Sequence, residues 1–208
     1  PRHLSRWFDC SLSNNASDIA KGVAALLLTV RGTPILYYGQ ELGLFNKTDI
    51  PPEQTSDYAV MDRDADEPAP PPRDGARTPM QWDASPQAGF SFGKDSQPWL
   101  PVHGDYVENN VETQLNDPHS VLNFYRALLR IRKHSPALRQ GKWRPLIDYP
   151  HEQFAYLREA DDETVLVVIN YAEARQLKTD KPIQPECWEV LLSNRFDPGK
   201  VMNLPRKL

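Results

Sequence analysis

Residues 17–39 combine a helix pattern with a short, continuously apolar segment. Apolar side chains recur at helical spacing over residues 19–30, and Gly32 suits the left-handed residue that often follows a helix. Residues 35–38 then form an apolar run that ends at Gly39. A run of this length predicts a strand buried on both faces, as in a parallel sheet that helices cover. We therefore expect part of an α/β fold.

The segment 42–116 shows no lasting periodicity and holds most of the prolines. Of the 20 prolines in the chain, 11 lie between residues 46 and 118. A structureless segment of this length inside a compact domain is uncommon and is usually functional or mobile. A disordered linker is the alternative, but linkers seldom contain tryptophans such as Trp82 and Trp99. We favour an ordered insertion.

A second strong helix pattern follows this segment. Asp117 is expected to be its N-cap, with Pro118 at the first helical position, and Pro136 ends it. Residues 118–147 carry seven Lys or Arg and no acid. A nucleic-acid patch is one interpretation, but the net charge of −4 favours a solvated basic helix face.

After Gly141 the pattern changes to short segments that alternate or run apolar. They predict strands at residues 142–147, 153–159, 164–171 and 187–193, with a turn at Asp161 and Asp162. The end from Asn203 onward shows no closing strand, so we expect a domain that is cut short. The two expected domains are residues 1–138, with the insertion at about 42–116, and a small antiparallel β domain at 139–208.

Cysteine usage and hydropathy exclude several classes of protein. Cys10 and Cys187 are too few for a disulfide framework or a metal-ligand pattern, which favours reduced thiols and a cytoplasmic location. No apolar run reaches the roughly 18 residues that a membrane span needs. We expect no metal, no cofactor, no membrane and no nucleic acid as partner. The chain starts at Pro1 without Met or a signal-peptide pattern, so we expect a fragment.

Two places carry residues that suit ligand chemistry. Glu41 follows the predicted strand, and ligand sites of parallel sheets lie at the carboxyl ends of their strands. Glu41 therefore either lines a substrate site or lies in a surface turn. The segment 73–83 holds two arginines, whose guanidinium groups can bind sugar hydroxyls, and Trp82, whose ring could face a sugar. The alternative there is a structural Arg–Asp pair in a turn.

Several longer motifs follow one another in a fixed order. They are Gly32-Thr-Pro-Ile-Leu-Tyr-Tyr-Gly-Gln-Glu-Leu-Gly43, Arg73-Asp-Gly-Ala-Arg-Thr-Pro-Met-Gln-Trp-Asp83, Pro98-Trp-Leu-Pro-Val102, Asn110-Val-Glu112, Asp117-Pro-His-Ser-Val-Leu-Asn-Phe-Tyr-Arg126 and Arg132-Lys-His-Ser-Pro-Ala-Leu138. Together they resemble the α-amylase superfamily of glycoside hydrolases (glycoside hydrolase family 13), in particular its α-glucosidase and oligo-1,6-glucosidase group. The resemblance implies the C-terminal portion of a (β/α)₈ TIM barrel, followed by a small antiparallel β domain.

The resemblance also implies a retaining glycosidase. Such enzymes use one carboxylate as nucleophile and a second carboxylic acid as proton donor. In this family these two acids, and a third carboxylate that steadies the distorted sugar, all precede the motifs above. We therefore expect no catalytic residue in these 208 residues and no activity of this chain alone. Arg77 matches the arginine that reaches the terminal glucose. Arg2 and Glu41 are weaker candidates for lining the site, and Arg73 and Asp74 are expected to brace the loop.

The expected partners are an α-glucoside or short oligosaccharide as substrate and the missing N-terminal barrel portion of the same protein. Two alternatives stay open. One is an isomerase or transglycosylase similar to trehalose synthase, and the other is a non-catalytic, amylase-like binding protein. The isomerases share the Arg-Thr-Pro-Met-Gln-Trp stretch at residues 77–82, so this segment separates them poorly from glucosidases. The intact Arg77 and the absence of a membrane span weigh against the binding protein.

Overall fold

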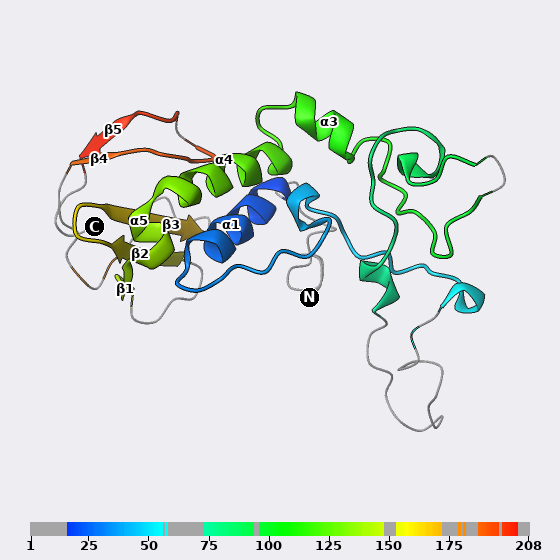
Figure 1. The fold of residues 1–208 in the computed structure, drawn as a ribbon, viewed down its shortest axis with the longest axis horizontal. Coiled ribbons are helices and arrows are strands. Elements are labelled where there is room, and N and C mark those ends of the chain that lie inside the picture. Colours follow the sequence, from blue (N-terminus) through cyan, green and yellow to red (C-terminus); the bar gives the residue numbers. More distant parts are fainter. Residues whose placement is uncertain are drawn as a thin grey trace, which may run out of the picture. The chain divides into compact units, whose positions relative to one another are not determined.

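The computed structural model describes residues 16–55, 57, 73–93, 96–147, 153–171, 179, 181, 187–195 and 197–203 (Figure 1). The chain divides into two compact units. The first unit comprises Pro1–Ala16 and Leu36–Asn123, and the second comprises Ser17–Ile35 and Phe124–Leu208. Among the described residues, no helix combines the length and the apolar character that crossing a membrane requires.

The helix predicted near the start of the chain is present as α1, Ala16–Thr29. Gly32 has a φ of 127°, a positive value that side chains other than glycine rarely adopt. Two arginines from distant segments satisfy the last carbonyl groups of this helix. Arg132 Nη1 donates to the carbonyl oxygen of Leu28 over 2.6 Å, and Arg158 Nη1 donates to that of Thr29 over 2.5 Å.

The strand predicted at residues 35–38 is absent from the structure. The backbone there has no regular secondary structure, and Ile35 is 80% exposed instead of buried. A β-strand exists only where a neighbouring strand pairs with its backbone N–H and C=O groups. The residues that the structure describes provide no such neighbour for this segment. The prediction of a doubly buried strand is therefore wrong for this chain.

The first unit is built mainly from short helical turns. They are the 3₁₀ helices η3 (Gln40–Leu42), η4 (Pro52–Gln54), η5 (Asp74–Ala76) and η6 (Pro86–Gly89) and the α-helix α3 (Val111–Asn116). The predicted ordered insertion is confirmed for its described residues, since Leu100, Gln81 and Asp74 are fully buried. The proline-rich run at 68–72 lies outside the described residues. Sequence periodicity missed α3 because six residues are too few to show it.

The second predicted helix is present as α4, Val121–His134, but it begins later than expected. Ser120 caps it, since its Oγ accepts a hydrogen bond from the backbone N–H of Asn123 at 3.1 Å. The Asp117 carboxylate instead accepts from the N–H of His119 at 2.8 Å and closes the preceding turn. The prediction that Asp117 caps the helix is wrong because this turn already uses its side chain.

The helix α4 ends before Pro136, as predicted, and a short helix α5, Pro136–Gln140, follows it. Ser135 caps α5 by accepting a hydrogen bond from the N–H of Leu138. Glu163 Oε2 accepts from both Ser135 Oγ and the N–H of Ala137, each at 2.7 Å. One carboxylate thus satisfies two donors at the start of the helix.

A three-stranded antiparallel sheet follows α5, as predicted. Its strands are β1 (Lys142–Pro145), β2 (Gln153–Glu159) and β3 (Thr164–Asn170), in the order β1-β2-β3. In this register Tyr156 lies opposite Pro145 and Val167. A second antiparallel pair joins β4 (Cys187–Glu189) to β5 (Val201–Asn203). The sequence did not predict β5, and residues 204–208, to which most of the expectation of no closing strand refers, lie outside the described residues.

The three-stranded sheet is covered on both faces. On one face, Tyr156, Val167 and Ile169 form a cluster that Leu26 and Val30 from α1 and its C-terminal end help to bury, and Figure 1 shows α1 lying along the sheet. On the other face, a cluster of buried residues packs against Trp188 of β4; its members are Leu146, Ala155 and Leu157. This double coverage explains why four consecutive residues of β2 are buried.

Candidate functional site

The first half of the segment 73–83 is held in place by buried carboxylates. Asp57 accepts hydrogen bonds from the backbone N–H of Arg73 at 2.7 Å and from its Nε at 3.1 Å. Asp74, which is also fully buried, accepts from the backbone N–H of Asp57 at 3.0 Å. The hydrogen bonds and the charge of Asp57 raise the pKa of Arg73. These contacts join two parts of the insertion that lie 16 residues apart.

Arg77 lies one turn beyond Asp74, at the end of η5. Its Nη1 donates to Asp74 Oδ1 at 3.1 Å, and 38% of its side chain remains exposed. The pair is the structural Arg–Asp contact that the sequence allowed. A buried carboxylate thus fixes one corner of the guanidinium group, and its other donors have no hydrogen-bond partner among the described residues.

Tyr38, which follows residues 35–37, contacts the motif at residues 73–83. Its hydroxyl donates to the carbonyl oxygen of Thr78 at 3.0 Å. Its ring lies 4.8 Å from the ring of Tyr37, centroid to centroid. Burial, reinforced by Tyr37, raises the pKa of Tyr38, so the hydroxyl stays protonated and acts as a donor at neutral pH. Gly39, with a φ of 84°, then turns the chain into η3.

The two remaining predicted site residues are Glu41, which the structure describes, and Arg2, which it does not. Glu41 is half-buried within η3 and belongs to the same unit as Arg77. Among the described residues Glu41 forms no ion pair with Arg77, so the structure brings their segments together without joining the two side chains. Arg2 lies outside the described residues.

Gln81 and Trp82 connect the motif to α3. The carbonyl oxygens of Gln81 and Trp82 accept from the N–H groups of Val111 and Glu112, each at 3.0 Å. The Gln81 side chain is fully buried and donates to Asp105 Oδ1 at 3.0 Å. With its backbone fixed on both sides, Trp82 leaves half of its surface exposed, which offers an apolar face to solvent.

Asp105 is a further fixed carboxylate near the motif. Burial alone would raise its pKa, but the hydrogen bonds and the charge of His103, together with the amides of Asn109 and Gln81, hold the pKa of Asp105 below its usual value. His103 Nδ1 lies 2.6 Å from Asp105 Oδ1. Asp105 therefore remains ionised and keeps the loop at 103–110 against Gln81.

Sequence reasoning missed Asp57 and Tyr38. Asp57 stands outside every motif, and nothing in the sequence shows that it pairs with Arg73. Tyr38 belongs to a motif but was assigned to the strand alone. A buried acid in a proline-rich, polar segment is detectable only through its partners. In chemical terms the arrangement presents hydrogen-bond donors and an aromatic face, while its carboxylates Asp57, Asp74 and Asp105 are occupied by donors.

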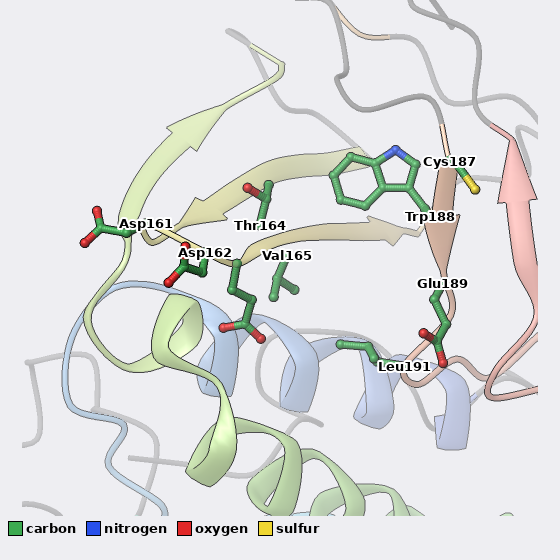
Figure 2. Close-up of a pocket in the computed structure, with 9 residues that line it drawn as sticks. Asp161, Asp162, Thr164, Val165, Cys187, Trp188, Glu189 and Leu191 are labelled. Atoms are coloured by element: carbon green, nitrogen blue, oxygen red, sulfur yellow. The ribbon is translucent and has the colours of Figure 1, made fainter.

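The second unit holds a hollow of about 500 Å³ beside the turn between β2 and β3 (Figure 2). Its acidic lining residues are Asp161, Asp162, Glu163 and Glu189. Figure 2 shows the Trp188 indole extending from β4 over the three-stranded sheet, in keeping with its packing against the core there. The predicted site residues that the structure describes, Arg77 and Glu41, do not line this hollow.

The comparisons with known proteins point in one direction. The family model "Alpha amylase, catalytic domain" matches residues 1–141. The chain is 34% identical to an oligo-1,6-glucosidase of Heyndrickxia coagulans, over 95% of this chain and 37% of the relative. It is 36% identical to a glucan 1,6-alpha-glucosidase of Streptococcus pneumoniae, over 93% of this chain and 37% of the relative.

Solved structures give the same result. A trehalulose synthase in complex with Tris superposes with a TM-score of 0.75 at 34% identity, over 92% of this chain and 37% of that one. An isomaltulose synthase of a Klebsiella species superposes with a TM-score of 0.72 at 29% identity, over 92% of this chain and 37% of that chain. The chain thus spans somewhat more than a third of the length of the proteins that it matches.

Proposed function

Since the chain belongs to the alpha-amylase family of catalytic domains, we propose that it forms the C-terminal part of a retaining α-glucosidase. The enzyme would hydrolyse terminal α-glucosidic bonds of short α-glucans or disaccharides. The predicted fold class, a (β/α)₈ barrel followed by a small antiparallel β domain, is confirmed by the matched structures, of which this chain carries a portion. The relatives that are glucosidases support the hydrolytic assignment.

The observation that carries the proposal is that Arg77 is held by Asp74 and is still partly exposed to solvent. Its guanidinium group is anchored by a fully buried carboxylate while a large part of it stays exposed. A planar fork of donors in this state suits the hydroxyl groups of a terminal glucose. We propose that Arg77 holds this sugar, that Trp82 contributes an apolar face, and that Arg2 and Glu41 lie along the same site.

The chemistry itself would be carried out by acids outside these residues. In a retaining glycosidase a carboxylate attacks the anomeric carbon while a carboxylic acid protonates the leaving oxygen, and water then hydrolyses the glycosyl–enzyme bond. Asp57 and Asp74 are buried acceptors of hydrogen bonds and serve neither role. The contribution of this chain is to place the glucose ring, which requires the rigid loop that Asp57 and Asp74 maintain.

The remaining assignments follow from the same proposal. Residues 1–138 would complete the barrel with a preceding segment of the same protein, and residues 139–208 would form the small β domain. The substrate partner would be an α-glucoside or short oligosaccharide, with no nucleic acid, membrane, metal or cofactor. We also propose a cytoplasmic location, which the exposed free thiol of Cys187 supports.

A sugar isomerase is the second candidate, and the match to trehalulose and isomaltulose synthases favours it. The two functions differ in whether water or a sugar hydroxyl takes the glucosyl group. The full-length protein should be incubated with isomaltose, maltose and sucrose, and the products followed by NMR. Free glucose released first as the α-anomer supports the glucosidase, whereas isomerised disaccharide refutes it. Absence of any turnover would favour a binding protein.

The 208-residue chain alone gives a second test. Since the proposed catalytic acids lie in a preceding segment, the chain should not hydrolyse p-nitrophenyl α-glucoside above background. Turnover by the purified chain, after controls for host glucosidases, would overturn the assignment of the catalytic acids to a preceding segment.

A further inference from the structure

A second, basic hollow lies at the C-terminal end of α1 within the second unit. It has a volume of about 510 Å³ and is lined by Arg31, Gly32, Thr33, Pro34, Arg132, Arg139 and Gln140. The three arginines come from three places, namely the end of α1, the helix α4 and the helix α5. No carboxylate belongs to this lining, so the hollow presents only positive charge and neutral polar groups.

Arg132 forms a fixed wall of this hollow. Its Nη1 donates to the carbonyl oxygens of Leu28 at 2.6 Å and Leu138 at 3.0 Å, and its Nη2 donates to that of Gly32 at 2.7 Å. The guanidinium group is therefore immobilised before any ligand arrives, and its Nε and one Nη2 hydrogen are not used by these bonds. A preorganised donor loses little entropy when it binds an anion.

Arg158 adds a second fixed positive charge to this region. Its side chain is fully buried, with Nη1 bound to the carbonyl oxygen of Thr29 and Nη2 to that of Gly141, and its Nε has no partner in the structure. Burial, then the charge of Arg132 and that of Arg31, lower the pKa of Arg158. The guanidinium groups thus lie close enough to repel one another.

Within the part of the chain that the structure describes, no carboxylate balances the positive charges of this region. Among the described residues, none of Arg31, Arg132, Arg139 and Arg158 forms an ion pair with a carboxylate. Burying a cation without a counter-ion is unfavourable, and an anion in a neighbouring hollow reduces that penalty. Backbone carbonyl oxygens compensate Arg132 and Arg158 only partly, so an anion in the hollow would add a favourable interaction.

We propose that this hollow is a binding site for a phosphate-type oxyanion, either inorganic phosphate or the phosphate group of a monoester. Three guanidinium groups line the hollow, each group can give two N–H donors to one tetrahedral anion, and Thr33 and Gln140 offer further donors. The carbonyl oxygens bound by Arg132 and Arg158 account for those two side chains in the absence of a ligand. These hydrogen bonds do not explain why Arg31 and Arg139 also line the same hollow.

Isothermal titration of the full-length protein with inorganic phosphate tests the proposal. Phosphate should bind with one site per chain, and the affinity should fall as sodium chloride is raised, because the interaction is electrostatic. Arg31→Ala and Arg139→Ala should each weaken binding by roughly tenfold or more, since each removes a charge-assisted contact. Both side chains are exposed, and neither donates to the carbonyl groups that end α1, so folding should be preserved.

Arg130→Ala is the matched control, because Arg130 is an exposed arginine on α4 that does not line the hollow. It should leave the phosphate affinity within about threefold of the parent protein. Glucose 6-phosphate in place of inorganic phosphate distinguishes a monoester ligand from the free anion, and glucose alone should not bind there. Absence of phosphate binding, equal losses in all three variants, or binding of an acidic peptide alone would overturn the proposal.

Discussion

Replacing Arg77 by alanine tests the proposed role of this residue in substrate binding. The Arg77 side chain is 38% exposed, and its guanidinium group is held by a hydrogen bond to the buried Asp74. We expect its free donors to bind hydroxyl groups of the terminal glucose in the full-length enzyme. A charge-assisted hydrogen bond is worth about 1.5–3 kcal/mol, so Arg77→Ala should lower kcat/KM by roughly 10- to 150-fold.

The same change also affects stability, because Asp74 keeps its bond to Asp57 but loses the one to Arg77. Leaving a buried acceptor partly unsatisfied costs about 1–3 kcal/mol, so the activities must be compared at equal folded fraction, measured by circular dichroism. Arg77→Lys keeps the charge but lacks the planar fork, and it should recover little of the lost kcat/KM.

Arg144→Ala is a closely matched control. The Arg144 side chain is also 38% exposed and forms one ion pair with a carboxylate, Glu159, at 2.9 Å. It lies on β1, where no substrate contact is proposed, so its loss should change kcat/KM less than about threefold. If Arg77→Ala keeps the kcat/KM of the parent enzyme, or if Arg144→Ala lowers it equally, Arg77 is only a structural partner of Asp74.

Three further predictions concern stability and are measured by urea unfolding of the full-length protein. Glu163→Ala removes the carboxylate that accepts two donors at the start of α5, and it should lower the free energy of unfolding by about 1–3 kcal/mol; no change would show that water replaces it. Gly75→Ala would place Cβ 2.3 Å from the carbonyl oxygen of Lys47, so it should destabilise by about 1–3 kcal/mol or more. The pKa of Asp105 is lower in the folded than in the unfolded chain. The ionised Asp105 therefore stabilises the fold above its ordinary pKa, and this stabilisation is lost as pH falls through the folded pKa. Between pH 6 and pH 3 Asp105→Asn should therefore lose less stability than the parent, and an equal loss would contradict the role of His103.

The sequence predicted the helices and the strands of the three-stranded sheet because each of them carries its own periodic pattern. The helices α1 and α4 and the strands β2 and β3 lie within a few residues of their predicted positions. The start of α4 was misplaced because Asp117 and Ser120 are both good caps. Only the packed structure shows which of the two side chains is already used in a turn.

The candidate site was predictable only through its motif. Arg77 could be proposed because it stands in a recognisable run of residues, whereas Asp57 and Tyr38 act through partners that lie 16 and 40 residues away in the sequence. The basic hollow was equally invisible, because Arg31, Arg132 and Arg139 are dispersed over more than a hundred residues. The sequence showed basic residues in 118–147 but not that two of them converge with Arg31.

The sequence alone determined the family and the positions of α1, α4, β2 and β3 to within a few residues, and it singled out Arg77 as a candidate. It could do so because motifs and periodicity are properties of neighbouring residues. Tertiary structure decided that residues 35–38 form no strand here and that Asp57 braces the motif. A strand needs hydrogen-bonding neighbours, and a buried charge needs a partner, and both come from distant parts of a chain. Interactions of this kind depend on how the chain folds back on itself, so they cannot be read from local sequence.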